Sequence, residues 1–374
     1  GLSLVGSEMC IRDSTNTMIS ALKSEDEKID IGHAGTAMRF LTSYYSSIIN
    51  SSKILTGSER MKQRPISILV DALNHIGAEI EYLESEGYPP IKLKGKLITN
   101  NVVILPANVS SQYISSLMML GVSLEDGLKI NLSTKITSLP YIKMTKILIE
   151  RIGGEVIIKS DKIIIKPFLA DNISDQTVES DWSSASYFYS LVALSDYSEI
   201  TISTFFKKSI QGDSRIENIY RKFGVETSFR DNKIHLKKVN VELPEIISIN
   251  LQDNPDLAQT IIITCLGLGV DCDLQGLHTL KIKETDRLIA LKKEIEKFDV
   301  DRVEVSDQSI ILKNNSKLKS NVTVDTYNDH RMAMSFAPLS LIIPIIIRNP
   351  EVVSKSYSNF WNDLKSVGFN ISKK

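Results

Sequence analysis

Three short segments of the sequence place positively charged side chains where a helix is expected to begin. Arg64-Pro65 precedes the run 66–75, and because proline is favoured at the first helical position, Arg64 is expected at the helix cap. Residues 283–287 open a run that continues to 291, and residues 329–331 open the apolar run 332–339. A helix N-terminus disfavours a cation by ~0.3–1 kcal/mol, and a bound anion would reverse this cost because it meets the dipole and the cation together.

The charges in these segments have two explanations. Lys283 and Arg287 are like charges four residues apart, which is unfavourable on a helix. Each arginine could pair with a local carboxylate, such as Asp286 or Asp329, and for one segment alone this is the simpler explanation. Three such segments on one chain favour a site for an anion, so we expect a substrate that carries several negative charges.

Two further segments fit the same chemistry. Residues 32–39 form a turn of small residues that leads into a helix, and Gly35 would let an anion approach the backbone amides there. The turn does not have the spacing of a Walker loop. Ser110-Ser111-Gln112 offers two hydroxyls and an amide before the helix 113–120, although a simple serine N-cap is the better explanation in isolation.

The composition is that of an ordinary globular protein, with 42% hydrophobic and 24% charged residues. Lys and Arg number 44 against 45 Asp and Glu, so there is no global field to hold nucleic acid or an anionic membrane. The most apolar stretch, 332–347, is shorter than the ~20 residues of a membrane span. Cys10, Cys265 and Cys272 fit a reducing compartment. The five histidines have no metal-ligand spacing, so we expect carboxylates and lysines to act as acids and bases.

A pattern of helix, chain reversal and two short strands recurs along the sequence. Amphipathic helices are expected to end near residues 77, 153, 224, 299 and 368, roughly seventy residues apart. Glycine stands at all of these positions except 299, and we expect it in the left-handed conformation. Strand-like alternation follows each helix, at 79–82, 155–158, 225–229, 303–305 and 369–371.

The repeat predicts two domains of three repeats each, with a boundary in the polar stretch 174–181. Six repeats would need about 420 residues, so the first is expected to be incomplete. Residues 1–13 show neither a clear period nor the basic region of a signal peptide, and look like translated adapter or read-through sequence. We therefore expect a non-native leader at 1–13, a first domain at 14–179 and a second domain at 180–374.

Seven segments resemble the 3-phosphoshikimate 1-carboxyvinyltransferase (EPSP synthase) family, and the resemblance extends over about residues 14–374. The segments are 34–39, 55–57, 60–65, 110–112, 183–188, 283–288 and 329–334. Lys-Glu-Thr-Asp-Arg at 283–287, followed by Asp-His-Arg at 329–331, is highly specific.

The resemblance implies an α/β fold of two inside-out domains, each built from three βαββαβ repeats, with the first repeat incomplete. It implies that the 5-hydroxyl of shikimate 3-phosphate attacks C2 of phosphoenolpyruvate, that C3 is protonated, and that the tetrahedral intermediate then loses phosphate. This is a step of the shikimate pathway towards chorismate and the aromatic amino acids, and a target of glyphosate. No metal or organic cofactor is expected, and we expect a cytoplasmic monomer, with a plastid location left open.

The resemblance also implies a role for each matching residue. Phosphoenolpyruvate would be held by Gly35, Arg64, Gln112, Arg287, Arg331 and Lys355. The phosphate of shikimate 3-phosphate would lie on Ser110, Ser111 and Ser138, with Tyr141 nearby. Asp256 would accept the hydroxyl proton, Glu284 and Lys283 would handle protons at C3 and at the leaving phosphate, and His330 is similar to the active-site histidine of the family.

One part of the family pattern has no match. The family begins with a strand that carries a Lys-Ser pair and, a few residues later, an arginine, and nothing in residues 1–14 matches this pattern. The chain is therefore expected to lack part of the phosphate clamp, and its own activity is left open. Two alternatives are a UDP-N-acetylglucosamine enolpyruvyl transferase, whose reactive cysteine is absent from residues 57–65, and a truncated chain that binds anions without catalysis.

Overall fold

The computed structural model describes residues 2–4, 13–108, 110–134, 136–169, 175–315 and 317–373. Its contacts divide the chain into two compact units, each with its own hydrophobic core. The N-terminal unit spans Asp13–Gln176, and the C-terminal unit combines strand β1 with the residues from Thr177 onwards. No helix in the described part of the chain is long and apolar enough to cross a membrane.

Four sheets share one topology, in which the first two strands are parallel and the last two form an antiparallel hairpin. In the N-terminal unit these sheets have the orders β2-β3-β5-β4 and β6-β7-β9-β8. Their strands are β2 (Lys28–Asp30), β3 (Ser52–Thr56), β4 (Glu79–Tyr82), β5 (Ile91–Lys94), β6 (Val102–Leu105), β7 (Leu128–Leu132), β8 (Val156–Ile158) and β9 (Lys162–Ile165).

The C-terminal unit contains the sheets β1-β10-β12-β11 and β13-β14-β16-β15, and a parallel pair, β17-β18. Their strands are β1 (Leu2–Leu4), β10 (Glu199–Ser203), β11 (Val225–Arg230), β12 (Lys233–Lys238), β13 (Ile246–Asn250), β14 (Asp271–Gln275), β15 (Arg302–Val305), β16 (Ser309–Lys313), β17 (Val322–Val324) and β18 (Ile345–Ile347).

The repeats that begin with β2, β6 and β13 run strand, helix, strand, helix and then hairpin along the chain, so both helices precede the hairpin. This order replaces the expected βαββαβ order. The repeat with β10, β11 and β12 takes β1 as its first strand, and no hairpin follows β18 in the described residues. The helices of the N-terminal unit are α2 (Asp13–Lys23), α3 (Gly35–Ser47), α4 (Ser67–His75), α5 (Ser111–Ser123) and α6 (Leu139–Arg151). Those of the C-terminal unit are α7 (Trp182–Leu194), α8 (Ile216–Tyr220), α9 (Ala258–Leu268), α10 (Arg287–Glu296), α11 (His330–Phe336) and α12 (Phe360–Ser366).

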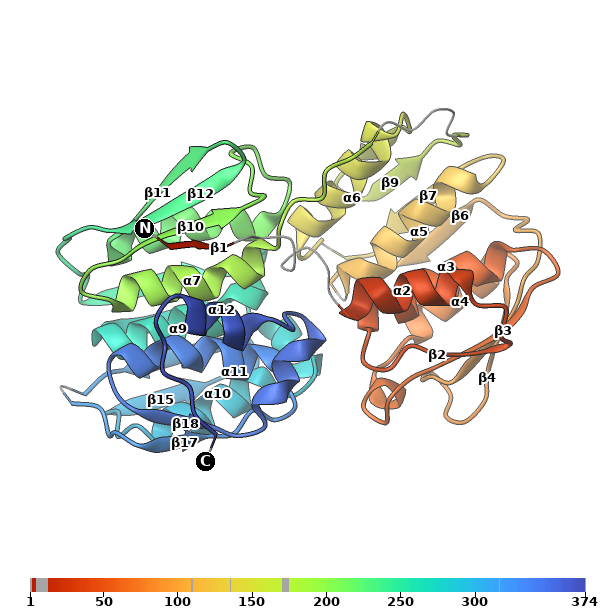
Figure 1. Ribbon diagram of the computed structural model, residues 1–374. Helices are drawn as coiled ribbons and strands as arrows, with labels where there is room; N and C mark the ends of the chain where they lie inside the picture. Colours follow the sequence, from red (N-terminus) through yellow and green to blue (C-terminus); the bar gives the residue numbers. More distant parts are fainter. Residues whose placement is uncertain are drawn as a thin grey trace. The chain divides into compact units, whose positions relative to one another are not determined.

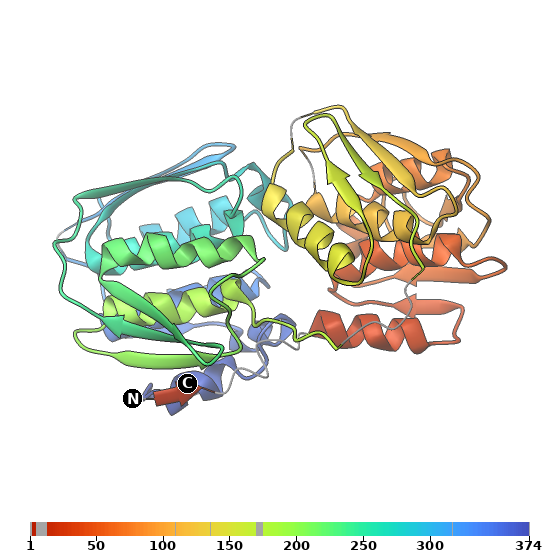
Figure 2. The same cartoon turned by 90° about the horizontal axis from the view of Figure 1, so that it is seen from above.

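The first helix of each repeat lies in the interior of its unit. All 13 residues of α7 are buried, as are the residues of α9 from Ala258 to Leu266. Helices α7, α9 and α11 contact one another at the centre of the C-terminal unit, with strands at its periphery (Figures 1 and 2). A helix that is apolar on all sides belongs in a core. The predicted inside-out α/β architecture is thereby confirmed.

The predicted chain reversals are found after the second helix of each repeat. Gly77, Gly153, Gly224 and Gly368 have φ between 76° and 110°, and Asp299 adopts the same left-handed conformation at φ 64°. The hairpins expected after the first four reversals are present. The strand predicted at 369–371 is wrong, because no described strand pairs with these residues, and Phe369 packs against the core instead.

The segment expected to be a non-native leader is described only in part. Residues 2–4 form β1, which lies parallel to β10 with Leu2 opposite Ile200. Residues 1 and 5–12 lie outside the described residues. The leader at 1–13 and the domain bounds 14–179 and 180–374 therefore remain predictions.

The left-handed turns should differ in their tolerance of a side chain. At Gly224 (φ 76°) an added Cβ would overlap the carbonyl oxygen of Val239, whereas at Gly269 (φ 70°) nothing lies within 4 Å. We expect Gly269→Ala to cost about 1 kcal/mol of unfolding free energy from backbone strain, and Gly224→Ala to cost at least about 1 kcal/mol more. Urea denaturation followed by circular dichroism measures both, and equal losses would contradict the steric argument.

Candidate active site

A single buried arginine joins three carboxylates in the C-terminal unit. Arg287 is the first residue of α10, and its side chain is only 2% exposed. Its Nε donates to Asp329 (2.7 Å), its Nη1 to Asp256 (2.9 Å) and its Nη2 to Glu284 (2.7 Å). These carboxylates come from the N-cap of α11, the 3-10 helix Pro255–Leu257 before α9, and the bend before α10. One guanidinium therefore fixes the starts of three helices relative to one another.

A second buried arginine and a lysine surround Asp256. Nη2 of Arg331 lies 3.3 Å from the Asp256 carboxylate, and Nη1 lies 3.4 Å from its backbone oxygen and 3.5 Å from the Tyr187 hydroxyl. The Lys283 Nζ lies 3.7 Å from the same carboxylate. Burial raises the pKa of Asp256, but Arg331, Lys283 and Arg287 together hold this pKa well below its usual range. Asp256 is therefore ionised at neutral pH.

His330 lies beside the cluster as a neutral imidazole. Its Nδ1 is buried and has no hydrogen-bond partner among the described residues; it lies 3.9 Å from an Asp329 carboxylate oxygen. Burial lowers the pKa of His330 to about 4, against the opposing effect of Asp329 and Glu284. At neutral pH this side chain can hold a proton on either nitrogen without carrying a charge.

Lys355 contributes a fourth cation to the same group of carboxylates. Its Nζ donates to the backbone oxygen of Asn328 (2.7 Å) from the 3-10 helix Pro350–Lys355. Burial lowers the pKa of Lys355, whereas Glu284 and Asp329 raise it. Hydrogen bonds and electrostatic contacts thus bring together all the site residues predicted in this unit, namely Asp256, Lys283, Glu284, Arg287, His330, Arg331 and Lys355.

Carboxylates of the protein already compensate much of the positive charge. Arg287 does have a local carboxylate partner, but this is Glu284, three residues earlier, and Arg287 also pairs with the distant Asp256 and Asp329. Asp286 instead caps α10 by accepting from the N–H groups of Leu288 and Ile289. An external anion would therefore have to share or displace existing partners.

In the N-terminal unit, Gly35 and Arg64 lie against each other. A Cβ on Gly35, the first residue of α3, would lie 2.5 Å from Nη1 of Arg64. Arg39 ties the two turns together, because its Nη1 donates to the Gly35 carbonyl (3.0 Å) and its Nη2 to the Pro65 carbonyl (3.5 Å). The Tyr113 hydroxyl donates to the same Pro65 carbonyl (2.6 Å). The absence of a side chain at Gly35 thus makes room for the guanidinium.

The prediction that Arg64 caps α4 is wrong. Helix α4 begins at Ser67 with Ile66 as its N-cap, and Arg64 instead follows the 3-10 helix Met61–Gln63. A residue that precedes proline avoids the helical region, and Arg64 is accordingly extended (φ −97°, ψ 120°).

The serine segment forms the start of α5. Ser110 is its N-cap and accepts from the backbone N–H of Gln112 (3.3 Å), as the simple-cap explanation requires. The Gln112 amide donates to Thr36 in the first turn of α3 (2.9 Å), which links Ser110 and Ser111 to the turn of Gly35.

The turn that carries Ser138 lies next to the segment leading to α5. The Thr137 N–H donates to the Ala107 carbonyl (3.1 Å). Ser138 is the N-cap of α6, with a left-handed backbone (φ 55°) and no capping hydrogen bond from its side chain, and Tyr141 lies in the first turn of that helix. The serines predicted to hold a phosphate therefore belong to adjacent turns.

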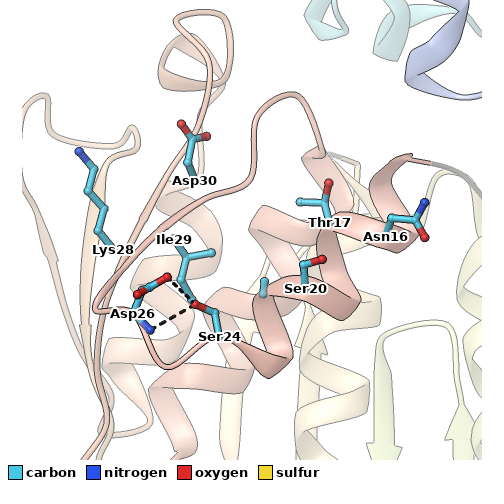
Figure 3. A pocket seen from close by; sticks show the side chains of 9 residues that line it. Asn16, Thr17, Ser20, Ser24, Asp26, Lys28, Ile29 and Asp30 are labelled. Atoms are coloured by element: carbon cyan, nitrogen blue, oxygen red, sulfur yellow. Dashed lines mark hydrogen bonds between the residues drawn. The ribbon is translucent and has the colours of Figure 1, made fainter.

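A separate hollow lies in the N-terminal unit, with a volume of about 610 Å³ (Figure 3). It is lined by Asn16, Thr17, Ser20, Ala21, Ser24, Asp26, Lys28, Ile29 and Asp30. None of the predicted site residues lines it. The predicted site residues therefore lie elsewhere in the fold.

Comparisons with known proteins show the family of the chain. The sequence profile of the EPSP synthase (3-phosphoshikimate 1-carboxyvinyltransferase) family matches residues 6–364. The chain belongs to the EPSP synthase family. Relatives named 3-phosphoshikimate 1-carboxyvinyltransferase include one from Bacteroides fragilis strain YCH46, 45% identical over 96% of this chain and 88% of its own length. Another, from Methanococcus aeolicus, is 34% identical over 100% of this chain and 88% of its own length.

Solved structures support the same fold. An EPSP synthase from Acinetobacter baumannii superposes with a TM-score of 0.71 at 21% identity, covering 94% of this chain and 81% of that one. The enolpyruvyl transferase NikO from Streptomyces tendae gives a TM-score of 0.65 at 12% identity, covering 90% and 77%. As a member of the EPSP synthase family, this chain is a transferase of the shikimate pathway, and its family binds phosphoenolpyruvate and shikimate 3-phosphate.

Sequence reasoning missed several residues of this EPSP synthase cluster. Tyr187 faces Arg331 from α7, and burial raises its pKa to about 12. Asp213 is fully buried and accepts from Ser183 and from the Asn254 amide (3.2 Å), one residue before Pro255. Burial and the nearby Asp256 raise the pKa of Asp213. Asp213 lies outside the matched segments, and only the fold brings it to this site.

The lowered pKa of His330 can be tested directly. We expect its imidazole to titrate near pH 4 in a proton–carbon NMR titration, and not near its ordinary value of 6.5, with the resonance assigned by its loss in His330→Gln. Between these values the unfolded chain binds a proton that the folded protein does not, so stability decreases as the pH falls through this window, by up to about 3 kcal/mol. His330→Gln should remove this part of the pH dependence in urea unfolding, and titration near 6.5 would contradict the burial argument.

Proposed function

We propose that this chain transfers the enolpyruvyl group of phosphoenolpyruvate to the 5-hydroxyl of shikimate 3-phosphate, with the residue roles that the family resemblance implies. The hydroxyl oxygen bonds to C2 while a proton adds to C3; loss of phosphate from C2 and of a proton from C3 restores the double bond. The observation that carries this proposal is the cluster of Lys283, Arg287, Arg331 and Lys355 around Asp256 and Glu284.

Phosphoenolpyruvate is the substrate that suits the cations of the C-terminal unit. Its carboxylate and phosphate place several negative charges on a small molecule, and charge moves onto the departing phosphate during the reaction. Fixed cations in a buried site stabilise such charge without reorganising. Of the two buried arginines, Arg331 is the more available, because its three contacts are all 3.3–3.5 Å, whereas those of Arg287 are 2.7–2.9 Å. The family resemblance also assigns Gly35, Arg64 and Gln112 of the N-terminal unit to phosphoenolpyruvate.

Shikimate 3-phosphate is assigned to the adjacent turns of the N-terminal unit. Ser110, Ser111 and Ser138 offer hydroxyl groups, and α5 offers its N-terminal amides, which suit a phosphate. Tyr141 lies close to Ser138, since its N–H donates to the Ser138 carbonyl (3.1 Å).

Substrate binding itself would prepare Asp256 to act as a base. With Arg331, Lys283 and Arg287 facing it, this carboxylate holds a proton poorly. The negative charges of phosphoenolpyruvate compensate the same cations and thereby raise the pKa of Asp256. Asp256 then accepts the hydroxyl proton, while Glu284 and Lys283 handle protons at C3 and at the leaving phosphate.

We also propose that the protein is a monomer and acts in the cytoplasm.

The function is tested by measuring phosphate release from the full chain. We expect release only when phosphoenolpyruvate and shikimate 3-phosphate are both present. Release with UDP-N-acetylglucosamine would instead support the sister reaction. Binding of both substrates without release would support the non-catalytic alternative and overturn the proposal.

Removing Arg331 should impair catalysis strongly. We expect Arg331→Ala to lower kcat/KM by about 10²–10³-fold, because a buried cation that faces the developing phosphate charge is lost. Arg302→Ala is the matched control, since Arg302 is an exposed arginine of the same unit that pairs only with Glu304 in the described contacts. Equal effects of the two substitutions on steady-state kinetics would refute the role of Arg331.

A side chain at Gly35 should act through Arg64. We expect Gly35→Ala to displace the guanidinium and raise the KM for phosphoenolpyruvate by about tenfold, the cost of one impaired charged hydrogen bond, with Gly35→Ser more severe. The KM for shikimate 3-phosphate is the internal control and should change little. Equal increases in both KM values would contradict this division of the site.

A further inference from the structure

The segment that carries Asp329, His330 and Arg331 is held in an unusual backbone conformation. Tyr327 and Asn328, which immediately precede Asp329, both have left-handed backbones (φ 52° and 55°). Outside a tight hairpin turn, two successive left-handed residues other than glycine carry a conformational cost that surrounding contacts must offset. Lys355 of the reacting cluster contacts Asn328, but the contact to Tyr327 comes from a group outside that cluster.

Glu294 of α10 supplies this contact. Its side chain is completely buried and accepts three hydrogen bonds, from the Tyr327 hydroxyl (2.6 Å), the Asp325 backbone N–H (2.9 Å) and the Lys297 Nζ (2.6 Å). Lys297 in turn donates to the Thr323 carbonyl (3.1 Å) and to the Asp325 carboxylate (2.9 Å). A buried carboxylate is tolerated only when it is paired in this way. Its partners all lead to the 323–327 stretch.

The same helix holds the segment at both ends. Arg287 and Glu294 lie seven residues apart on α10, two turns along one face. Arg287 binds Asp329, and Glu294 binds Asp325 and Tyr327. Lys355 donates to the Asn328 carbonyl between these two anchors. The position of the Asp329–Arg331 helix start is thus set by α10 at two points.

We propose that Glu294 is a positioning residue that orders residues 325–331 and so places His330 and Arg331 for phosphoenolpyruvate. Glu294 does not contact the reacting groups itself, and its effect passes through Tyr327 and Asp325. The part of this inference that concerns phosphoenolpyruvate rests on the proposed function, whereas the ordering of the segment does not.

Three variants separate the contributions of Glu294. Glu294→Leu removes every acceptor, Tyr327→Phe removes one hydrogen bond and leaves the fold of α10 intact, and Glu294→Gln keeps an oxygen for Asp325 and an amide that can donate to the tyrosine oxygen. Glu296→Leu is the control, because Glu296 is a half-exposed glutamate of the same helix that pairs with Lys292. If Glu294→Leu does not fold, Tyr327→Phe decides the result.

The first measurement is amide hydrogen exchange of peptides that cover residues 324–332 in the full chain. We expect exchange there to accelerate on the order of tenfold in Glu294→Leu, less in Tyr327→Phe and little in Glu294→Gln, with the remainder of the C-terminal unit unaffected. Exchange in this segment that matches the Glu296→Leu control in both Glu294→Leu and Tyr327→Phe would overturn the proposal.

The second measurement is steady-state kinetics. We expect the KM for phosphoenolpyruvate to rise about tenfold in Glu294→Leu, with the KM for shikimate 3-phosphate unchanged and recovery in Glu294→Gln. A merely destabilising change would lower kcat through the folded fraction and move neither KM, and this result would overturn the positioning role. If the unsubstituted chain releases no phosphate, the proposed function has failed, and hydrogen exchange alone decides the role of Glu294.

Discussion

The candidate site of the C-terminal unit depends on one buried guanidinium, that of Arg287. It donates to Asp256, Glu284 and Asp329 at 2.7–2.9 Å, and these carboxylates belong to segments that precede α9, α10 and α11. Three carboxylates gathered in a buried place repel one another unless a cation lies among them, and a buried cation is tolerated only with such partners. The guanidinium thus removes the repulsion among the carboxylates, and the carboxylates offset the cost of burying the guanidinium. The spacing of the helix starts, and hence of the reacting groups, follows from this mutual compensation.

This compensation also determines how an anionic substrate can enter. The cluster is not an unpaired positive patch, so affinity depends on exchanging partners and not on simple attraction. The contacts of Arg287 are short, and breaking them would leave buried carboxylates without a cation. Those of Arg331 are longer, which makes this side chain the easier one to redirect towards a ligand. One arginine thus maintains the framework while the other is available to the substrate, although both belong to the first turn of a helix.

Local sequence patterns predicted the structural repeat, but not the side-chain contacts between residues that are distant in the sequence. Left-handed turns at residues 77, 153, 224 and 368, and the hairpins after the first three of them, could be predicted because each depends on a few adjacent residues. Arg64 was misplaced because α4 begins at Ser67 with Ile66 as its N-cap, so that Pro65 precedes the cap and does not occupy the first helical position. The bond from Arg287 to Asp329 spans 42 residues, and Glu294 reaches Tyr327 across 33. No local period encodes such contacts, since they exist only once the helices have packed.

The repeat itself explains why the chemistry collects at helix starts. Gly35, Ser110, Asp256 and Asp329 stand at or just before the interior helices α3, α5, α9 and α11, which occupy equivalent places in successive repeats, and Asp181 caps α7 in the same way. Within the C-terminal unit these helices contact one another, so their partly positive N-termini and their aspartates are held close together. The second helix of a repeat adds further contacts. In α10, Arg287 supplies the positive charge that binds Asp329, and Glu294 accepts the hydrogen bond that holds Tyr327. The repeat thus places the N-terminal ends of the interior helices of a unit near one another. The different residues that occupy these equivalent positions then determine the chemistry of the site.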